Sequence, residues 1–400
     1  MKETYSEDRD QTKGRSPRTL IFSQRNLTSI QPFRCAHFEF EDVIAEIDEA
    51  EFVAPAFNPN TRRQWFTKQL AYHTPLRLNP GVKRVPIDKQ YDLFFAICGN
   101  PTDLLRIASV SNWRANCRKA VCLIDEVWAR EVRSYGNYLR TLRQFDLVVL
   151  YYSQSVDPID EVIRQKKCLF LPPGVDAMRF CPYPDPPQRH IDVYSVGRRS
   201  AVSHKSFLKM ANDDGMFYLY DTTSADRVLD PIEHRVLVAK VAKRSRYYIV
   251  NPGLIDRPDV RGNQIEIGNR YFEGAAAGNI LLGERPRNGQ FEHFFDWPDS
   301  LIDLPYNSPD AEKIVRELDR QPERLARIQK MNIQQSLLRH DWVYRWEAIL
   351  EAVGLPCSPR LALRKEKLQR LADKVIADQA VDPQGGAPYI ASRSGRSMNR

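Results

Sequence analysis

Arg270 and Glu273 are the residues of this sequence whose types and spacing most clearly suggest chemistry. They lie three apart in a stretch that reads as a short helix, so they share one helical face. Gly268 precedes that helix, and the free backbone N–H groups at a helix start can hold a phosphate. A cation and a carboxylate beside such an anion site predict a nucleotide pocket. A surface ion pair on an amphipathic helix would look the same, so this stretch alone leaves both interpretations open.

Gly197 and Arg198 form a second candidate anion site. They follow an apolar run at 191–196 that predicts a strand, and ligands of open α/β sheets bind at the carboxyl ends of strands. Gly197 would let a ligand approach the backbone closely, and Arg198 can pair bidentately with a diphosphate. A solvated loop arginine is the plainer interpretation. Together with the stretch at 268–273, however, the two sites favour one anion-binding region.

Alternating strands and helices must position these residues, and this alternation predicts parallel sheets covered on both faces. The predicted strands lie at 19–23, 51–55, 91–97, 119–124, 145–151 and 168–172, then at 191–196, 216–220, 247–250 and 280–282. The predicted helices lie at 40–49, 61–72, 102–116, 128–143 and 157–165, then at 201–212, 230–244 and 268–277, with mainly helical sequence at 309–354 and 359–379.

Composition breaks divide the chain into two α/β domains. A proline-rich linker is expected at 176–188, because Pro182, Pro184, Pro186 and Pro187 make the chain semi-rigid there. The predicted parts are a disordered tail at 1–17, an N-terminal Rossmann-like domain at 18–175, a C-terminal Rossmann-like domain at 189–340, helices at 341–379 and a disordered basic tail at 380–400.

Composition bounds the class of protein. The chain has 400 residues, 42% hydrophobic and 28% charged, as in an ordinary soluble protein. It has no apolar run near the roughly 18 residues that span a bilayer, and its polar start lacks a signal peptide, so a cytoplasmic location is expected. The seven cysteines are scattered without metal-ligand spacing, which favours free, mostly buried thiols and no zinc site.

The net charge of +8 would suit a nucleic acid, an anionic membrane or a phosphorylated substrate. We find no nucleic-acid-binding motif to accompany it, so nucleic acid is not expected as a partner. Much of the excess lies near the C-terminus, which makes peripheral membrane contact through that region an open question. The basic residues concerned are Arg360, Arg364, Lys365, Lys367, Arg370, Lys374, Arg393, Arg396 and Arg400.

These motifs, taken together, resemble the donor-binding half of GT-B glycosyltransferases of group 1. The matching features are the strand followed by Gly197-Arg198, a later lysine, and Arg270-x-Phe272-Glu273 before small residues and a glycine. Residues 172–182 look like the family's crossover between domains. Residues 269–273 (Asn-Arg-Tyr-Phe-Glu) are most similar to the CgeB-like, spore maturation branch. The resemblance covers about 168–350 and is only topological over 18–167.

The resemblance implies roles for named residues. Glu273 matches the glutamate that binds the donor ribose, and Gly268 and Asn269 match the backbone that meets the donor sugar and diphosphate, next to Arg270. Arg198 and Lys205 match the cations that stabilise the leaving nucleoside diphosphate, a role that needs no metal ion. Fixed cations suit it because negative charge grows on the departing phosphate.

Two positions depart from the family pattern. Retaining relatives often carry two glutamates with seven residues between them, but six separate Glu266 from Glu273. Either Glu266 is displaced by a local shift or the first role is absent, so retention of configuration is not implied. Lys205 is displaced by about two positions, so either His204 or Lys205 is a candidate for the second cation.

The N-terminal domain is expected to hold the acceptor. Asp125 and Glu126 follow an apolar strand and would face the cleft. Asp125 could orient an acceptor hydroxyl or act as a base, and Trp128 could stack on a sugar. The alternative is Asp125 as a helix N-cap with Trp128 in the core. The aromatic residues at 342–346 are expected to seat a C-terminal helix that crosses back to the N-terminal domain.

The sequence therefore predicts an α/β protein of GT-B type, with two Rossmann-like domains and a deep interdomain cleft. The expected activity is that of a metal-independent, hexosyltransferase-type glycosyltransferase in glycan or surface polysaccharide biosynthesis. Its substrates would be a nucleotide-diphosphate sugar, with no further cofactor, and a carbohydrate or other hydroxyl acceptor. A nucleotide-sugar epimerase of the same architecture and a non-catalytic nucleotide-sugar-binding protein are the alternatives.

Overall fold

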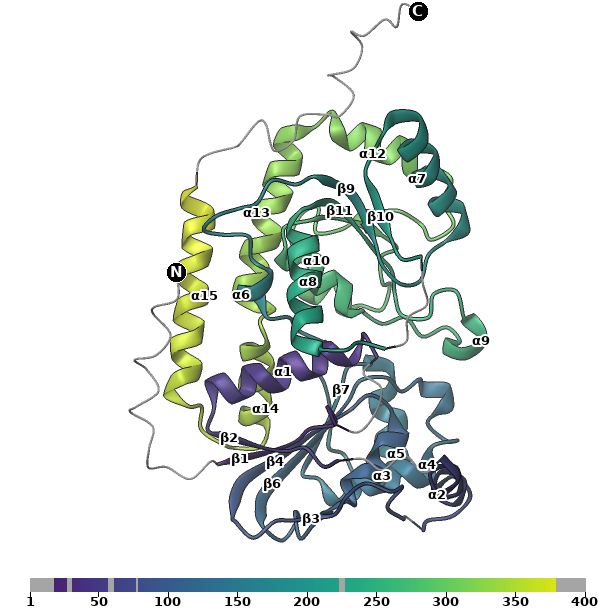
Figure 1. Cartoon of the computed structure of the whole chain (residues 1–400), viewed down its shortest axis with the longest axis vertical. Coiled ribbons are helices and arrows are strands. Elements are labelled where there is room, and N and C mark those ends of the chain that lie inside the picture. The colour runs from purple at the N-terminus through teal and green to yellow at the C-terminus, as the bar shows by residue number, and fades with distance from the viewer. Residues whose placement is uncertain (1–17, 27–30, 57–60, 77, 223–226, 379–400) are drawn as a thin grey trace, which may run out of the picture.

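The computed structural model describes residues 18–378 apart from 27–30, 57–60, 77 and 223–226, and its main strands form two parallel sheets (Figure 1). The two predicted tails lie outside the described residues. The first sheet has the order β2-β1-β4-β6-β7-β8. Its strands are β1 (Thr19–Phe22), β2 (Ala50–Val53), β4 (Tyr91–Cys98), β6 (Cys117–Ile124), β7 (Leu147–Leu150) and β8 (Cys168–Phe170).

Both faces of this sheet are covered, which explains its apolar strands. Residues 93–98 of β4 and 120–124 of β6 are buried without interruption, as expected where helices cover both faces of a parallel sheet. The surrounding helices are α1 (Arg34–Ile47), α2 (Thr61–His73), α3 (Leu104–Ile107), α4 (Gly136–Leu139) and α5 (Val156–Ile163). Two short strands, β3 (Val85–Pro86) and β5 (Val110–Ser111), pair separately.

Two helices predicted for this half are wrong in length. At 102–116 the chain forms only a 3₁₀ turn and α3, because Val110 pairs with Val85 and Asn112 has a left-handed φ of 62°. At 128–143 it forms 3₁₀ turns on either side of the four-residue α4, which begins at Gly136, a residue type that disfavours one continuous helix across this stretch. The predicted helix at 40–49 begins six residues earlier, at Arg34.

The second sheet has the order β10-β9-β11-β12-β13 and is also parallel. Its strands are β9 (Ile191–Ser195), β10 (Tyr218–Tyr220), β11 (Ser245–Val250), β12 (Ile280–Gly283) and β13 (Ile302–Asp303). Its helices are α7 (Ala201–Asp214), α8 (Pro231–Lys243), α9 (Pro258–Arg261), α10 (Asn269–Ala276), α11 (Gln290–Phe294), α12 (Ala311–Asp319) and α13 (Pro322–Arg339). The short α6 (Ala177–Phe180) lies in the crossover between the sheets.

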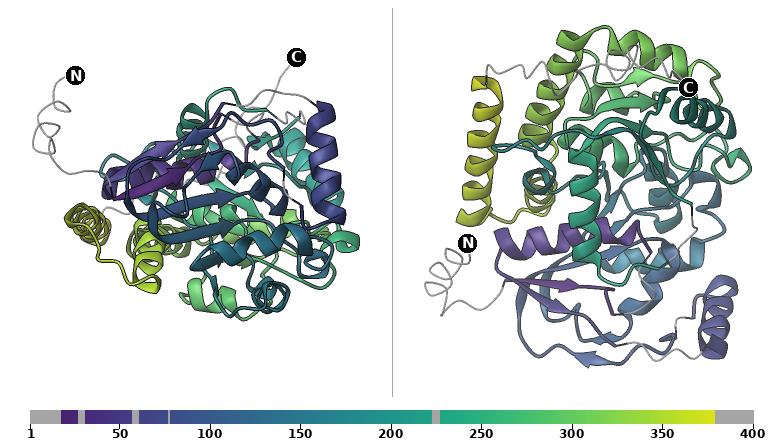
Figure 2. Two further views of the ribbon diagram at one scale, coloured as in Figure 1. Left: turned by 90° about the horizontal axis from the view of Figure 1, so that it is seen from below. Right: turned by 45° about the horizontal axis from the view of Figure 1, so that its top comes forward.

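The last two helices return to the first half of the chain, as predicted. They are α14 (Trp342–Ala352) and α15 (Pro359–Ala377), and α15 packs against both α13 and α1 (Figures 1 and 2). The Trp342 ring stacks on Phe40 of α1, with centroids 4.6 Å apart. Trp346 donates a hydrogen bond to Asp48 at 3.0 Å. These tryptophans therefore join the C-terminal helices to the first sheet.

Two basic residues of the helix α15 form ion pairs with other helices or with the crossover, and one of the two is buried. Arg364 is buried and bonds Asp341 and Asp176, each at 2.8 Å. Lys365 pairs with Glu347 at 2.8 Å. These ion pairs neutralise part of the charge of α15, whereas Lys367, Arg370 and Lys374 stay exposed, so membrane contact through this region stays a prediction. Within the described residues no helix is both long and apolar enough to cross a bilayer.

We predict that Trp342→Ala destabilises the protein by about 3–5 kcal/mol, because it removes a fully buried ring from between α14 and α1. Urea unfolding followed by circular dichroism measures the change. Leu363→Ala is the matched control, since Leu363 of α15 is exposed, and it should change stability by less than about 0.5 kcal/mol. Equal unfolding midpoints for Trp342→Ala and wild type would contradict this packing.

Candidate functional site

Loops at the carboxyl ends of both sheets meet between the two halves of the chain. A Cβ built on Gly253, after β11, would lie 3.4 Å from the Tyr152 hydroxyl, after β7. In the same region Gln264 accepts a hydrogen bond from the backbone N–H of Ala129 at 2.8 Å. Because ligands of open α/β sheets bind outside the carboxyl ends of strands, this junction is where a site is expected.

The two predicted anion sites lie in contact. Gly197 has a φ of 80°, and a Cβ at this position would lie 2.5 Å from Nη2 of Arg270. Only glycine therefore lets the loop after β9 lie against the Arg270 guanidinium. Among the described residues Arg270 has no carboxylate partner, so its charge is available at the start of α10.

The start of α10 is open to an anion. Gly268 is the N-cap residue, and no side chain caps this end of the helix. Asn269 and Arg270 form its first turn, where backbone N–H groups lack partners within the helix. The partial positive charge of the helix end adds to that of the guanidinium. The structure thus brings Gly197, Gly268, Asn269 and Arg270 together.

Two acidic side chains accept hydrogen bonds from donors that were predicted to bind phosphate. The backbone N–H of Gly197 donates to Asp221 at 2.5 Å, and Arg198 Nη1 donates to both carboxylate oxygens of Asp256, at 2.9 and 3.0 Å. Arg198 and Asp256 are both well exposed. These contacts place carboxylate oxygens on donors that a diphosphate would use, and an exposed ion pair of this kind is weak.

Glu273 lies in a buried ion-pair network. Its carboxylate accepts a hydrogen bond from Arg235 of α8 and a longer one, at 3.4 Å, from the Tyr248 hydroxyl. Arg235 also donates to both oxygens of Glu39 on α1, at 2.9 and 3.2 Å. Burial acts to raise the pKa of Glu39, but the Arg235 charge outweighs it and the pKa is lowered. One arginine therefore joins carboxylates from the two halves of the chain.

Glu266, predicted as a donor ligand, is hydrogen-bonded to other residues of the chain in the structure. Its carboxylate accepts hydrogen bonds from the backbone N–H groups of Ser153 and Gln154 and from the Ser153 hydroxyl, each at 3.1 Å. It also accepts one from Gln264 at 2.8 Å. Burial raises the pKa of this carboxyl. Glu266 is thus committed to a contact between the two halves, which the six-residue spacing from Glu273 could not reveal.

Asp125 forms a pair with a histidine on the first-half side of the junction. Its Oδ2 lies 2.7 Å from Nε2 of His37, which is buried on α1. The Asp125 side chain is more exposed than the His37 side chain, so the carboxylate is the outer member of the pair. The alternative of a helix N-cap is wrong, because Trp128 holds the cap position of the following turn.

Glu126 and Trp128 follow Asp125 on the first-half side of the junction. Trp128 Nε1 donates to Glu126 at 2.9 Å, and its ring packs on Tyr152 with centroids 4.7 Å apart. Trp128 is buried, so it belongs to the core as the plainer interpretation held and offers no face for a sugar. Burial raises the pKa of Glu126, while the Trp128 hydrogen bond and the charge of Arg198 act to lower it. Arg198 of the second half thus lies near Glu126.

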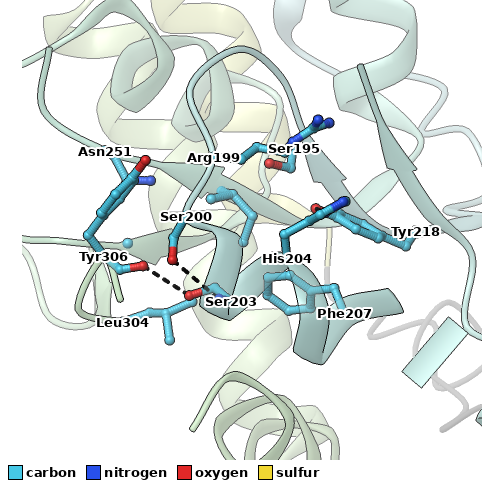
Figure 3. A pocket seen from close by; sticks show the side chains of 12 residues that line it. Ser195, Arg199, Ser200, Ser203, His204, Phe207, Tyr218, Asn251, Leu304 and Tyr306 are labelled. Atoms are coloured by element: carbon cyan, nitrogen blue, oxygen red, sulfur yellow. Dashed lines mark hydrogen bonds between the residues drawn. The ribbon is translucent and has the colours of Figure 1, made fainter. Parts of the chain in front are cut away.

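A small hollow opens beside α7, at the carboxyl ends of β9, β11 and β12 (Figure 3). Its free space is about 20 Å³, enough for about one water molecule. His204 lines it and lies 2.9 Å from the Tyr218 hydroxyl, whereas Lys205 is exposed on α7 and is not a lining residue. The prediction of Lys205 as a catalytic cation therefore gains no support. Arg199, which packs on Tyr220, contributes the charge there.

Sequence reasoning missed four polar residues of this region, namely His37, Arg235, Asp221 and Asp256. Each finds its partner far along the chain or in a loop, so no local spacing marks it. The described residues hold no group of three or more His, Cys, Asp or Glu side chains placed to bind a metal ion. Their seven cysteines are free, and five of these are buried.

Comparison with known proteins identifies the fold. Residues 218–351 match the model of a protein family described as "Glycosyl transferase-like". The chain is similar to an α-glucosyltransferase in complex with UDP and a 13-mer DNA, with 12% identity, 84% of this chain and 99% of that chain covered, and a TM-score of 0.50. At this identity the likeness concerns the fold alone, and the two parallel sheets agree with it. The chain has the GT-B fold, with two Rossmann-like domains.

Two further solved structures are similar at slightly lower scores. An α,α-trehalose-phosphate synthase (UDP-forming) from Burkholderia vietnamiensis is 9% identical, with 85% of this chain and 99% of that chain covered and a TM-score of 0.49. Anabaena Alr3699/HepE in complex with UDP-glucose is 11% identical, with 84% and 99% covered and a TM-score of 0.48. No curated protein matches the sequence.

We predict that Arg235→Met destabilises the protein by about 3–5 kcal/mol at neutral pH, because Glu273 loses its cation and the buried Glu39 keeps only a longer ion pair with Arg179, at 3.4 Å. The pKa of Glu39 is lowered in the folded protein, so its stabilising contribution is present above its ordinary pKa and is lost as the pH falls. The gap between wild type and variant should therefore narrow as the pH falls through about 4. Denaturant unfolding at several pH values measures it.

The control for this experiment removes the charges on both sides. Adding Glu39→Gln and Glu273→Gln to Arg235→Met should recover much of the lost stability, since no uncompensated charge then remains buried. A loss of stability that does not depend on pH, or no loss at all, would mean that the ion pairs of this network do not stabilise the folded protein as predicted.

Proposed function

We propose that this protein is a glycosyltransferase that moves a sugar from a nucleoside-diphosphate donor to an acceptor hydroxyl. The observation that carries the proposal is the contact between Gly197 and Arg270 at the uncapped start of α10. It supplies backbone N–H groups, a helix end and a guanidinium that pairs with no carboxylate of the described residues, at the carboxyl edge of the second sheet. The match of 218–351 to a glycosyl transferase-like family supports the same assignment.

In the proposed reaction the cations act on the leaving group. As the bond between the anomeric carbon and the diphosphate oxygen breaks, negative charge grows on the diphosphate. Arg270 and the first turn of α10 face that charge, and Arg198 joins them once the donor replaces Asp256 as its partner. Fixed donors of this kind stabilise the transition state without reorganising. We propose that they make a metal ion unnecessary.

Asp125 is the proposed base. Its carboxylate accepts the proton of the acceptor hydroxyl, whose oxygen then forms the new bond to the anomeric carbon. His37, on the buried side of the pair, holds this carboxylate in place through Nε2. A donor bound at the junction would exclude water from the anomeric carbon and limit hydrolysis. Glu273, as the proposed ribose ligand, is held through Arg235.

The finer assignments extend this proposal. The segment at 269–273 supports placing the chain near the CgeB-like branch, and the GT-B fold suits a hexosyl donor and a carbohydrate acceptor in polysaccharide biosynthesis. We propose a cytoplasmic enzyme with no cofactor beyond its nucleotide-sugar donor. Lys205 and Glu266 have no part in this mechanism, because the first is exposed on α7 and the second binds Ser153 and Gln154.

A donor screen tests the proposal. We expect the wild-type protein to release a nucleoside diphosphate from at least one of a panel of UDP-, GDP-, ADP- and dTDP-sugars. Arg270→Ala should lower the rate of release by about 100-fold or more, with a smaller change in donor affinity. Arg320→Ala, at the end of α12, is the control for a lost surface arginine and should keep the rate.

The other outcomes separate the alternatives. Interconversion of nucleotide sugars without release would indicate the epimerase. Donor binding without turnover, over a broad panel of hydroxyl acceptors, would indicate a binding protein. If no nucleoside diphosphate binds to the wild type, both enzyme readings are wrong.

The role of Asp125 is tested by replacing Asp125 and, separately, its neighbour Glu126 with the corresponding amide. Asp125→Asn should lower kcat by about 10²–10⁴-fold, the usual worth of a general base, with little change in donor affinity. Glu126→Gln is the matched control, because its amide oxygen can still accept the hydrogen bond from Trp128. Single-turnover transfer rates measure both variants. A stronger effect from Glu126→Gln would assign the base to Glu126 instead.

A further inference from the structure

The helix α2 (Thr61–His73) presents its largest side chains to solvent. Trp65 is 65% exposed, Phe66 55% and Tyr72 43%, and they continue into Leu76 at 61% and Leu78 at 48%. We call these five residues the α2 patch. It stands at an outer corner of the first half of the chain, away from α15 (Figures 1 and 2).

The orientation of α2 is the reverse of that of an ordinary surface helix. Its buried residues are small ones, Thr67 and Ala71, and Ala71 joins a minor cluster with Leu105 and Tyr138. The Tyr138 hydroxyl also donates to the carbonyl of Lys68 and fixes the helix in this position. A helix that packs its small residues inward leaves its aromatic residues for another surface.

Positive charge surrounds the α2 patch. Residues 52–87 contain six Lys or Arg and no Asp or Glu, in a chain whose whole net charge is +8. Arg62 and Lys68 are exposed on α2, and among the described residues neither pairs with a carboxylate. Arg62, Trp65, Lys68 and Tyr72 follow one another at spacings of three and four, so cations and rings share one face of the helix.

We propose that the α2 patch docks onto an anionic lipid bilayer. Tryptophan and tyrosine rings favour the headgroup level, cations are attracted to anionic headgroups, and leucines gain from entering the acyl boundary. The exposed side chains of Leu76 and Leu78 favour a bilayer over a nucleic acid. A nucleic acid would bind the cations and stack on the rings, but it gains nothing from exposed aliphatic side chains. This inference is independent of the proposed function, because membrane docking requires neither donor nor acceptor.

Vesicle sedimentation with the full-length protein tests the proposal. We expect binding to vesicles of phosphatidylcholine with phosphatidylglycerol at low salt, and much weaker binding to phosphatidylcholine alone or at high salt. Trp65→Ser with Phe66→Ser should weaken binding by about tenfold or more. Arg62→Gln and Lys68→Gln should weaken it by about fivefold each. Phe217→Ser, a loss of a half-exposed ring in the second half, is the matched control and should bind like wild type.

A second readout uses the wild-type protein without any substitution. Trp65 is the one exposed tryptophan among the six of the chain, all of which lie in the described residues. On binding to vesicles its fluorescence should shift to shorter wavelength, and aqueous iodide should quench it less. A variant truncated after residue 378 should behave in the same way, because the basic C-terminal tail is not part of the α2 patch.

Four results would overturn the proposal. They are no binding of wild type to anionic vesicles, binding that the α2 variants retain, loss of binding on truncation after residue 378, and binding without any change at Trp65. Two other outcomes would assign the α2 patch to a different partner when the wild type does not bind vesicles. If the α2 substitutions abolish binding of a single-stranded oligonucleotide, the patch binds nucleic acid. If they abolish a concentration-dependent dimer, the patch binds a second copy of the chain.

Discussion

The position of one buried guanidinium, that of Arg235, constrains the whole arrangement. Burying an arginine is costly unless carboxylates surround it, and its two partners come from opposite halves of the chain. Glu39 on α1 also accepts hydrogen bonds from the backbone N–H of Asp176 in the crossover, at 2.9 Å, and from the Trp342 indole, at 3.0 Å. The network therefore fixes α1, α8, α10, α14 and the crossover relative to one another.

The proposed site follows from that constraint. Glu273 and Arg270 lie on the same short helix, so the contact that holds Glu273 also places the start of α10. On the other side α1 carries both Glu39 and His37, two positions apart, and His37 holds Asp125. The proposed anion site at the start of α10 is thus linked to one end of the ion-pair network, and the proposed base Asp125 is linked to the other end. Substrate recognition by such a site would rest on a rigid frame, with exposed contacts such as Arg198–Asp256 free to exchange.

How much the sequence predicts depends on where each residue finds its partners. Short runs of mainly apolar residues in the sequence identify every strand of both main sheets except the two-residue β13. Gly197 and Arg270 could be assigned to one region because both lie in the same predicted domain. The start of α1 was missed because His37 and Glu39 look like surface residues. Their partners lie 88 and 196 residues away, so no local pattern shows that they are buried. The contacts of Glu266 could not be predicted for the same reason, since its partners at 153 and 154 belong to the other half.

The most direct test of this account is a crystal structure with a nucleoside diphosphate bound. The diphosphate should lie at the start of α10 between Gly197 and Arg270, with Arg198 released from Asp256 and the Glu39–Arg235–Glu273 network unchanged. A diphosphate bound elsewhere, for example in the hollow beside His204 or on the first sheet, would contradict the assignment of the site. So would a bound state in which Arg235 leaves either carboxylate, because the frame would then not be the fixed element on which the site depends.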